Sequence, residues 1–165
     1  QALRRTVGVV THEPMLYDQL TGRENLTFVA RMFGLYNIEE RVQGSADRMG
    51  VTARLDQRVA AMSHGLRKRF SIARALLHEP LVLLLDEPES GLDQEALGLL
   101  ERVVADYAGR SRTVLMTTHN LERGLSLGHR MAILSRGRIA YQGSLDAVGT
   151  AAARDAYARY TEAST

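Results

Sequence analysis

Three absences set the limits of this sequence. It contains no cysteine, which excludes a disulfide framework and a thiolate metal site. No apolar run reaches the ~18 residues that a helix needs to cross a bilayer, so a membrane role is expected to come through a partner. The only lysine is Lys68, and no glycine is directly followed by lysine, so the phosphate-binding pattern GxxxxGK[ST] is absent.

The composition indicates a folded globular domain. The chain has 165 residues, of which 45% are apolar and 24% are charged, close to the average for globular proteins. The net charge is only +2, and the densest basic cluster, Arg67–Arg69, is too short to indicate a nucleic-acid site. We therefore expect one domain and no nucleic-acid partner. The chain starts at Gln1 without an initiator Met, which favours a piece of a longer protein.

The first half of the chain divides into a strand region and a helical block. Val7–Val10 is a short β-branched run, so residues 7–21 are expected to form a strand and a loop. Thr21 and Glu24 then have the spacing of a helix capping box. Apolar residues recur at helical spacing after this box, which predicts a helical subdomain over residues 22–78.

The second half alternates strands with helices. Leu81–Leu85 is a short, uninterrupted apolar run, typical of a strand buried on both faces of a parallel sheet. Residues 79–143 are therefore predicted to form a parallel α/β core, and residues 144–165 two short C-terminal helices. The other elements expected in this core are a helix at Leu92–Tyr107, a strand at Thr113–Thr117, a helix at Leu121–Leu127, a strand at Met131–Ser135 and a returning strand at Ile139–Gln142.

The strongest chemical signal is the run LVLLLDEPESGLD at Leu81–Asp93. A buried strand that ends in Asp86 and Glu87 places two carboxylates at the sheet edge where α/β proteins bind ligands. Adjacent carboxylates in such a place are costly unless a cation or a polarised water compensates them. The run therefore predicts a cation or an activated water at this edge, rather than an ordinary acidic turn.

Two weaker signals flank this run. Upstream, Ser63 and Gly65 stand at the start of a helix, where free backbone amides and the helix dipole attract an anion and glycine lets a phosphate come close. Downstream, His119 follows the strand at Thr113–Thr117. Neither signal is specific by itself, and a lone histidine after a strand is more often structural than catalytic.

In this order, the three runs resemble motifs of the ABC ATPases. LVLLLDEPESGLD resembles the Walker B motif and the D-loop, and Thr117–His119 resembles the H-loop. The resemblance implies that Asp86 holds Mg²⁺, usually through water. It also implies that Glu87 polarises the water that attacks the γ-phosphate of ATP, and that His119 contacts that phosphate.

The run MSHGL at residues 62–66 resembles the family's signature, usually LSGGQ. Ser63 and Gly65 keep its second and fourth positions, whereas its first, third and fifth positions depart from it. The resemblance implies that Ser63 and Gly65 bind the ATP held by an opposite subunit, and that Asp93 in the D-loop lies at the same dimer interface. We therefore expect a second nucleotide-binding subunit as a partner.

The resemblance is incomplete towards the N-terminus. Family members carry a glutamine in the Q-loop after the first strand, and here that position falls on His12 or on Glu13, depending on one residue of register. Walker A and the residue that stacks on adenine are expected before residue 1. The implied fold is α/β, a partial P-loop NTPase (RecA-like) parallel sheet with an inserted α-helical subdomain.

The function implied is that of the ATP-binding and ATP-hydrolysing subunit of an ABC transporter, with ATP and Mg²⁺ as cofactors. A transmembrane permease subunit would be its partner, on the cytoplasmic face of the cell membrane, with residues 15–17 and 31–36 lining the groove for it. The combination of THEPMLYDQLTGRENL at residues 11–26 with ARMFGLY at residues 30–36 resembles exporter ATPases, including the haem exporter of cytochrome c maturation. Two alternatives stay open: an ABC ATPase that acts on ribosomes or DNA, and a non-hydrolysing regulatory subunit. The chain alone is expected to hydrolyse no ATP.

Overall fold

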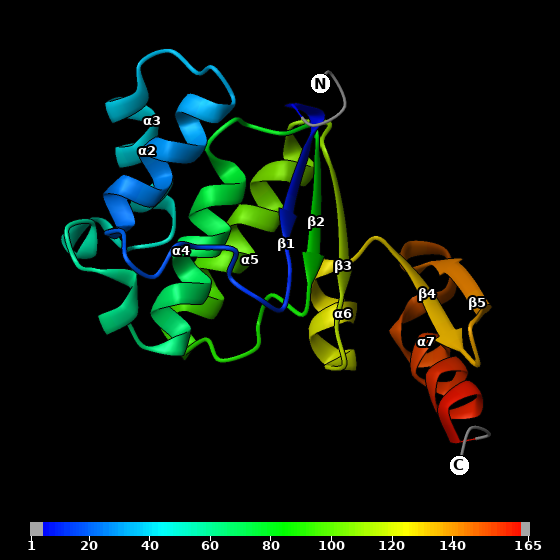
Figure 1. Cartoon of the computed structure of the whole chain (residues 1–165). Coiled ribbons are helices and arrows are strands. Elements are labelled where there is room, and N and C mark those ends of the chain that lie inside the picture. Colours follow the sequence, from blue (N-terminus) through cyan, green and yellow to red (C-terminus); the bar gives the residue numbers. More distant parts are fainter. Residues whose placement is uncertain (1–4, 163–165) are drawn as a thin grey trace. The chain divides into compact units, whose positions relative to one another are not determined.

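A computed structural model describes residues 5–162, which divide into two compact units. The first unit ends at Thr117 and the second begins at Thr118. Each unit contains a β-sheet of its own, and Figure 1 labels the helices and strands along the chain. Among the described residues, no helix combines the length and the apolar character that a bilayer-spanning helix requires.

The first unit is built on a three-stranded parallel sheet in the order β1-β2-β3. The strands are β1 (Val7–Val10), β2 (Val82–Asp86) and β3 (Thr113–Thr117). Val10 pairs with Leu85 on one side of β2, and Asp86 pairs with Thr117 on the other. Because the strands are parallel, the loops that follow them leave from the same edge. The structure confirms the predicted α/β class and places the ends of all three strands at one edge.

One face of this sheet carries two helices. The crossovers from β1 to β2 and from β2 to β3 run in the same direction, and crossovers between parallel strands share one hand, so α4 (His64–Leu76) and α5 (Gln94–Gly109) lie on the same side (Figure 1). Leu83 and Leu85 on that side are buried, whereas Val82 and Leu84 on the other side are only half-buried, and Leu115 of β3 beside Leu84 is 64% exposed. The expectation that the run at 81–85 is buried on both faces is therefore wrong, because burial on both faces needs a layer on each.

The predicted helical block is present in the first unit. It consists of α2 (Gly22–Met32), α3 (Ile38–Arg48), the short 3₁₀ turns η1 (Thr52–Arg54) and η2 (Val59–Ala61), and α4. The capping box starts α2 as expected, since the Glu24 amide donates to the Thr21 hydroxyl at 3.1 Å and the Thr21 amide donates to the Glu24 carboxylate at 2.7 Å. Leu26 of α2, Met49 at the end of α3 and Phe70 of α4 are fully buried, so all three helices contribute to the core.

The second unit contains α6 (Leu121–Leu127), β4 (Arg130–Ser135), β5 (Arg138–Ser144) and α7 (Leu145–Glu162). A small core of Leu125, Leu145 and Ala153 holds it together. Gly149, with φ of 76°, breaks α7 into the two helical pieces that the sequence predicted. The strand at Met131–Ser135 was expected in the parallel core. The predicted pairing with the returning strand is confirmed, because β4 pairs antiparallel with β5. Within the described residues these two strands form a sheet of their own, so the expectation that Met131–Ser135 joins the parallel core is wrong.

Candidate functional site

The two predicted carboxylates lie at the carboxyl edge of the parallel sheet. Asp86 ends β2, and its Oδ1 accepts a hydrogen bond of 2.7 Å from the Thr117 hydroxyl of β3. The Glu87 amide donates to the same hydroxyl oxygen at 3.1 Å and to the Thr117 carbonyl oxygen at 3.2 Å. Glu87 has φ of 41°, in the left-handed region that few non-glycine residues adopt. Thr117 therefore fixes the direction in which the chain leaves β2.

This arrangement suits a cation held by a single carboxylate. Among residues 5–162, no group of three or more His, Cys, Asp or Glu side chains converges as in an all-protein metal cage. Mg²⁺ needs no such cage, because it usually binds one or two carboxylates together with waters and substrate phosphates. Asp86 is exposed and keeps Oδ2 outside its bond to Thr117, so it fits this mode. The adjacent Glu87 supplies a second carboxylate of the kind that can act as a general base.

The loop after β1 reaches the same edge. Its side chains at His12 and Glu13 are exposed, and the Thr11 hydroxyl donates to the Glu13 carbonyl oxygen at 2.6 Å. Because β1 pairs directly with β2, the structure brings the His12–Glu13 stretch to the edge that carries Asp86. Both candidates for the Q-loop position therefore face solvent beside the carboxylates.

A buried lysine lies beneath these two loops. The Lys68 side chain of α4 is 1% exposed, and its ammonium donates to the carbonyl oxygen of Thr11 at 3.2 Å and to that of Asp86 at 3.4 Å. Burial lowers the pKa of Lys68, and the negative charges of Asp86, Glu89 and Glu87 oppose this shift. The sequence did not lead us to expect that Lys68 contacts the backbone of these two loops. Its one available signal was a lone lysine in a chain whose other cations are arginines.

The signature turn forms the start of α4. The Ser63 hydroxyl accepts from the Leu66 amide at 3.3 Å and thereby caps the helix. The Arg67 guanidinium donates to the carbonyl oxygens of Met62 and Ala60, at 3.2 and 3.1 Å, and holds the segment that enters the helix. Ser63 is exposed, as a residue that contacts a ligand from outside the chain must be.

The signature turn packs closely against the D-loop of the same chain. A Cβ added at Gly65 would lie 2.6 Å from the Gly91 carbonyl oxygen, and one added at Gly91 would collide with the His64 ring. Gly91 also has φ of 75°, which favours glycine. The sequence predicted that Gly65 lacks a side chain so that phosphate can approach. The structure adds a second reason, which is the close approach of the Gly91 backbone.

Asp93 has a structural role that the sequence reasoning did not identify. Its Oδ1 accepts from the Ala96 amide at 2.8 Å and caps the N-terminus of α5. The signal was available, because an aspartate immediately before an amphipathic helix is a common cap. The cap fixes the direction in which the D-loop enters α5.

His119 is exposed and belongs to the second unit, between β3 and α6. The neighbouring Asn120 caps α6 through an Oδ1 that accepts from the Arg123 amide at 3.1 Å, and its own amide donates to the Thr118 hydroxyl at 2.9 Å. The structure thus orders the turn that carries His119. It brings Asp86, Glu87 and the His12–Glu13 loop together within the first unit, and the role of His119 stays a prediction.

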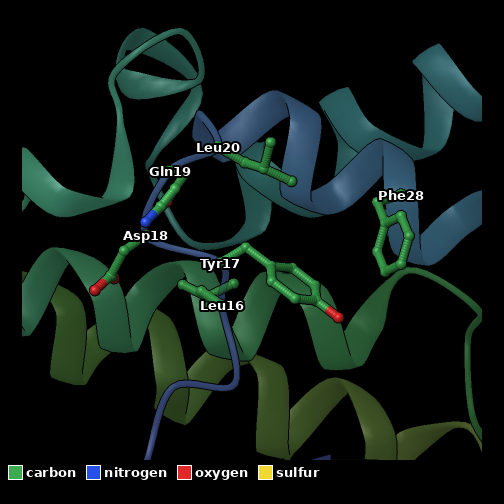
Figure 2. A pocket seen from close by; sticks show the side chains of 6 residues that line it. All are labelled: Leu16, Tyr17, Asp18, Gln19, Leu20 and Phe28. Atoms are coloured by element: carbon green, nitrogen blue, oxygen red, sulfur yellow. The ribbon is translucent and has the colours of Figure 1, made fainter.

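An apolar pocket opens on the helical side of the first unit. It has a volume of about 580 Å³ and is lined by the loop before α2 and by one residue of that helix (Figure 2). Its lining residues are Leu16, Tyr17, Asp18, Gln19, Leu20 and Phe28. The Tyr17 and Phe28 rings meet edge to face with centroids 5.4 Å apart. Asn25 holds the Tyr17 backbone through hydrogen bonds of 2.8 and 3.1 Å.

The chain is similar to ATP-binding proteins of ABC transporters. It is 30% identical over 149 residues to the ABC transporter ATP-binding protein NatA of Bacillus subtilis. The aligned region covers 88% of this chain and 61% of NatA. It is 38% identical over 143 residues to the Nod factor export ATP-binding protein I of Burkholderia thailandensis, covering 86% of this chain and 47% of that protein. The chain thus spans about half to three-fifths of the length of these relatives. Neither name refers to haem.

Solved structures share the fold. An ATP-binding subunit of an ABC transporter superposes with a TM-score of 0.87 at 27% identity, over 97% of this chain and 70% of that one. A dimeric ATP-binding cassette with bound ADP and Pi superposes with a TM-score of 0.79 at 22% identity, which shows the fold alone. The model of the ABC transporter family matches residues 1–90, more than half of the chain. This chain therefore belongs to the ABC transporter family and forms part of its ATP-binding domain.

Proposed function

We propose that the chain is part of an ATP-hydrolysing subunit that drives export through an ABC transporter. The observation that carries this proposal is the Asp86–Glu87 pair at the carboxyl edge of the sheet, oriented by Thr117. In this proposal Asp86 binds the Mg²⁺ of MgATP, Glu87 accepts a proton from the attacking water, and His119 contacts the γ-phosphate. Residues 22–78 form the helical subdomain and residues 79–143 the catalytic core.

The proposed active site is shared between two subunits. Ser63 and Gly65 at the start of α4 bind the phosphate of an ATP held by a second nucleotide-binding subunit, and Asp93 lies at that interface. The support is an exposed helix N-terminus, whose backbone amides and dipole favour an anion. The fold is also shared with an ATP-binding cassette that is a dimer. His12 or Glu13 takes the Q-loop position beside Mg²⁺ and water.

The decisive experiment replaces Glu87 by glutamine in the subunit that combines this chain with a phosphate-binding loop. We expect turnover to fall by ~10²-fold or more, as for the loss of a general base, while ATP binding and dimerisation persist. Glu40→Gln in α3 is the matched control, because Glu40 is an exposed carboxylate outside the site. Unchanged hydrolysis in the Glu87→Gln subunit would rule out Glu87 as the base. The chain alone is expected to show no turnover.

We propose that the pocket before α2 receives a helix of a transmembrane permease subunit, which would hold the protein at the cytoplasmic face of the membrane. Large apolar side chains around it are exposed, and the pocket itself is lined by Tyr17 and Phe28. Tyr17→Ala with Phe28→Ala should weaken co-purification with the permease and leave the ATPase activity of the isolated subunit unchanged. Leu134→Ala is the control, since Leu134 is an exposed apolar residue of β4. Undiminished co-purification would contradict this assignment.

The export direction is supported by similarity to proteins named for Nod factor export. Haem export in cytochrome c maturation is a narrower candidate, and it rests only on the sequence of the segments at residues 11–26 and 30–36. Co-purification with a haem-binding membrane subunit would support haem export. A polysaccharide or drug permease encoded next to this protein would exclude it. Transport is favoured over action on DNA because α2 and α3 have only 11 residues each, too short for a long coiled coil. Co-sedimentation of the protein with ribosomes tests the alternative of an ABC ATPase that acts on ribosomes.

A further inference from the structure

Lys68 stands where three segments of the first unit meet. It lies in α4, the helix that begins directly after Ser63. Its ammonium bonds to Thr11, the first residue after β1, and to Asp86, the last residue of β2. Both partners are backbone carbonyl oxygens, so the lysine fixes the main chain of two neighbouring loops rather than one mobile side chain.

The physical cost of this arrangement points to a specific role. An ammonium group removed from water is destabilising unless hydrogen bonds and opposite charges compensate it. An apolar side chain of similar volume would fill the same space without that cost. At Lys68 the compensation comes from the two carbonyl oxygens and from the negative charges of Asp86, Glu87 and Glu89. All of these groups belong to the edge that carries the candidate site.

The neighbouring cations of α4 show that this contact is local. The Arg69 guanidinium donates to the carbonyl oxygens of Met49 and Gly50, at 2.8 and 3.0 Å, at the end of α3. Arg74 donates to the Val9 carbonyl oxygen at 2.8 Å, within β1. Lys68 therefore ties α4 to the loops that leave β1 and β2, whereas Arg69 ties the same helix to the helical block.

We infer that Lys68 is a positioning residue of the ATPase, which holds the loop at residues 11–13 and the Asp86–Glu87 turn in a fixed position relative to the helix that starts at the signature. This inference rests on the proposed function, because it assigns these loops to the nucleotide site. Its consequence is that loss of the Lys68 ammonium loosens the loop at residues 11–13 and the Asp86–Glu87 turn together.

The first test measures amide hydrogen exchange in the full chain and requires no ATPase activity. Lys68→Met removes the donors and keeps the approximate volume, and we expect peptides covering residues 11–14 and 86–88 to exchange about tenfold faster, because the local opening of these loops is no longer restrained. Arg69→Met is the matched control, since it also removes two carbonyl contacts and one charge from α4. It should speed exchange near residues 49–50 and, because its guanidinium also lies 3.8 Å from the Glu95 carboxylate, near the start of α5, but not at residues 86–88. Unchanged exchange at 86–88 in Lys68→Met, or an equal effect of both variants there, would overturn the inference.

The second test measures hydrolysis in the subunit that contains the phosphate-binding loop. Lys68→Met should lower kcat by about tenfold and change KM for ATP by less than about threefold, because small displacements of catalytic groups slow the chemical step more than they weaken binding. Lys68→Arg keeps a cation and its donors and should restore most of kcat. An equal loss in Lys68→Arg would overturn the inference, and so would a normal kcat in Lys68→Met.

The two tests separate the failure of this inference from the failure of the proposed function. A wild-type subunit that hydrolyses no ATP would refute the proposed function, while the exchange measurement would still decide whether Lys68 holds the two loops. If Lys68→Met does not fold, Lys68→Arg takes its place in the exchange measurement. Exchange at residues 86–88 as slow as in the wild-type chain supports the role of the donors, and faster exchange there contradicts it.

Discussion

The close approach of the signature turn to the D-loop makes Gly65→Ala an informative substitution. The new Cβ would lie 2.6 Å from the Gly91 carbonyl oxygen, where ordinary contacts begin at 3.4 Å. Either the start of α4 or the D-loop must move by several tenths of an ångström. Both segments belong to the proposed shared site. Because the clash lies within this chain, the substitution lowers the free energy of unfolding even when no nucleotide is bound.

The magnitude follows from two opposing effects. Overpacking a tight contact costs about 1–3 kcal/mol of unfolding free energy. Replacing glycine by alanine within a helix returns about 0.5–1 kcal/mol, because alanine loses less backbone entropy on folding. We therefore expect Gly65→Ala to destabilise the chain by about 1 kcal/mol, the difference between the mid-values of these two effects.

Gly44→Ala in α3 is the matched control. Gly44 is exposed in a helix interior, and an added Cβ there meets no atom within 4 Å. This variant should be more stable than the wild-type chain by about 0.5–1 kcal/mol. Urea unfolding followed by circular dichroism measures both variants against the same reference. If Gly65→Ala proves as stable as Gly44→Ala, the contact between Gly65 and Gly91 is not close, and our account of the signature turn is refuted.

Two further predictions concern single side chains. Burial lowers the pKa of His78 below the ordinary 6.5, and its Nε2 donates to the Val7 carbonyl oxygen at 3.1 Å. As the pH falls, the unfolded chain therefore binds a proton at this residue before the folded chain does. The contribution of His78 to the free energy of unfolding should therefore be fully present above pH 6.5 and should fall as the pH drops towards the folded-state pKa. Urea unfolding at a series of pH values measures this dependence, and His78→Phe should remove the part that His78 causes. Asp93→Ala should cost about 1 kcal/mol through loss of the cap on Ala96, whereas Asp93→Asn keeps an acceptor; equal losses in urea unfolding would contradict the cap.

Local patterns in the sequence predicted the elements well where the structure depends on nearby residues. The capping box at Thr21 and Glu24 forms as expected. The strand at Thr113–Thr117 and the helix at Leu121–Leu127 have the predicted bounds. These features depend on hydrogen bonds and periodicities that span a few positions, which a sequence displays directly.

The predictions that failed all concern packing between distant segments. The run at 81–85 has the apolar pattern of a doubly covered strand, but coverage depends on which helices lie on each face. The strand at Met131–Ser135 pairs with the returning strand as predicted, but its residues do not show whether the hairpin also joins the parallel sheet, and in the structure β4 and β5 form a sheet of their own. Pairing partners are decided by chain reversal and by competition among strands, which the strand's own residues do not encode.

The sequence by itself determined the chemical inventory of this protein: two adjacent carboxylates after an apolar strand, a serine and a glycine at a helix start, and the order in which these occur. Only the tertiary structure decided how these groups are held. Thr117 is 31 residues from Asp86, and Lys68 is 57 residues from Thr11, yet each pair is hydrogen-bonded. Such contacts arise when parallel strands align their ends and a helix crosses beneath them, so their cause lies in the register of the sheet rather than in any local motif.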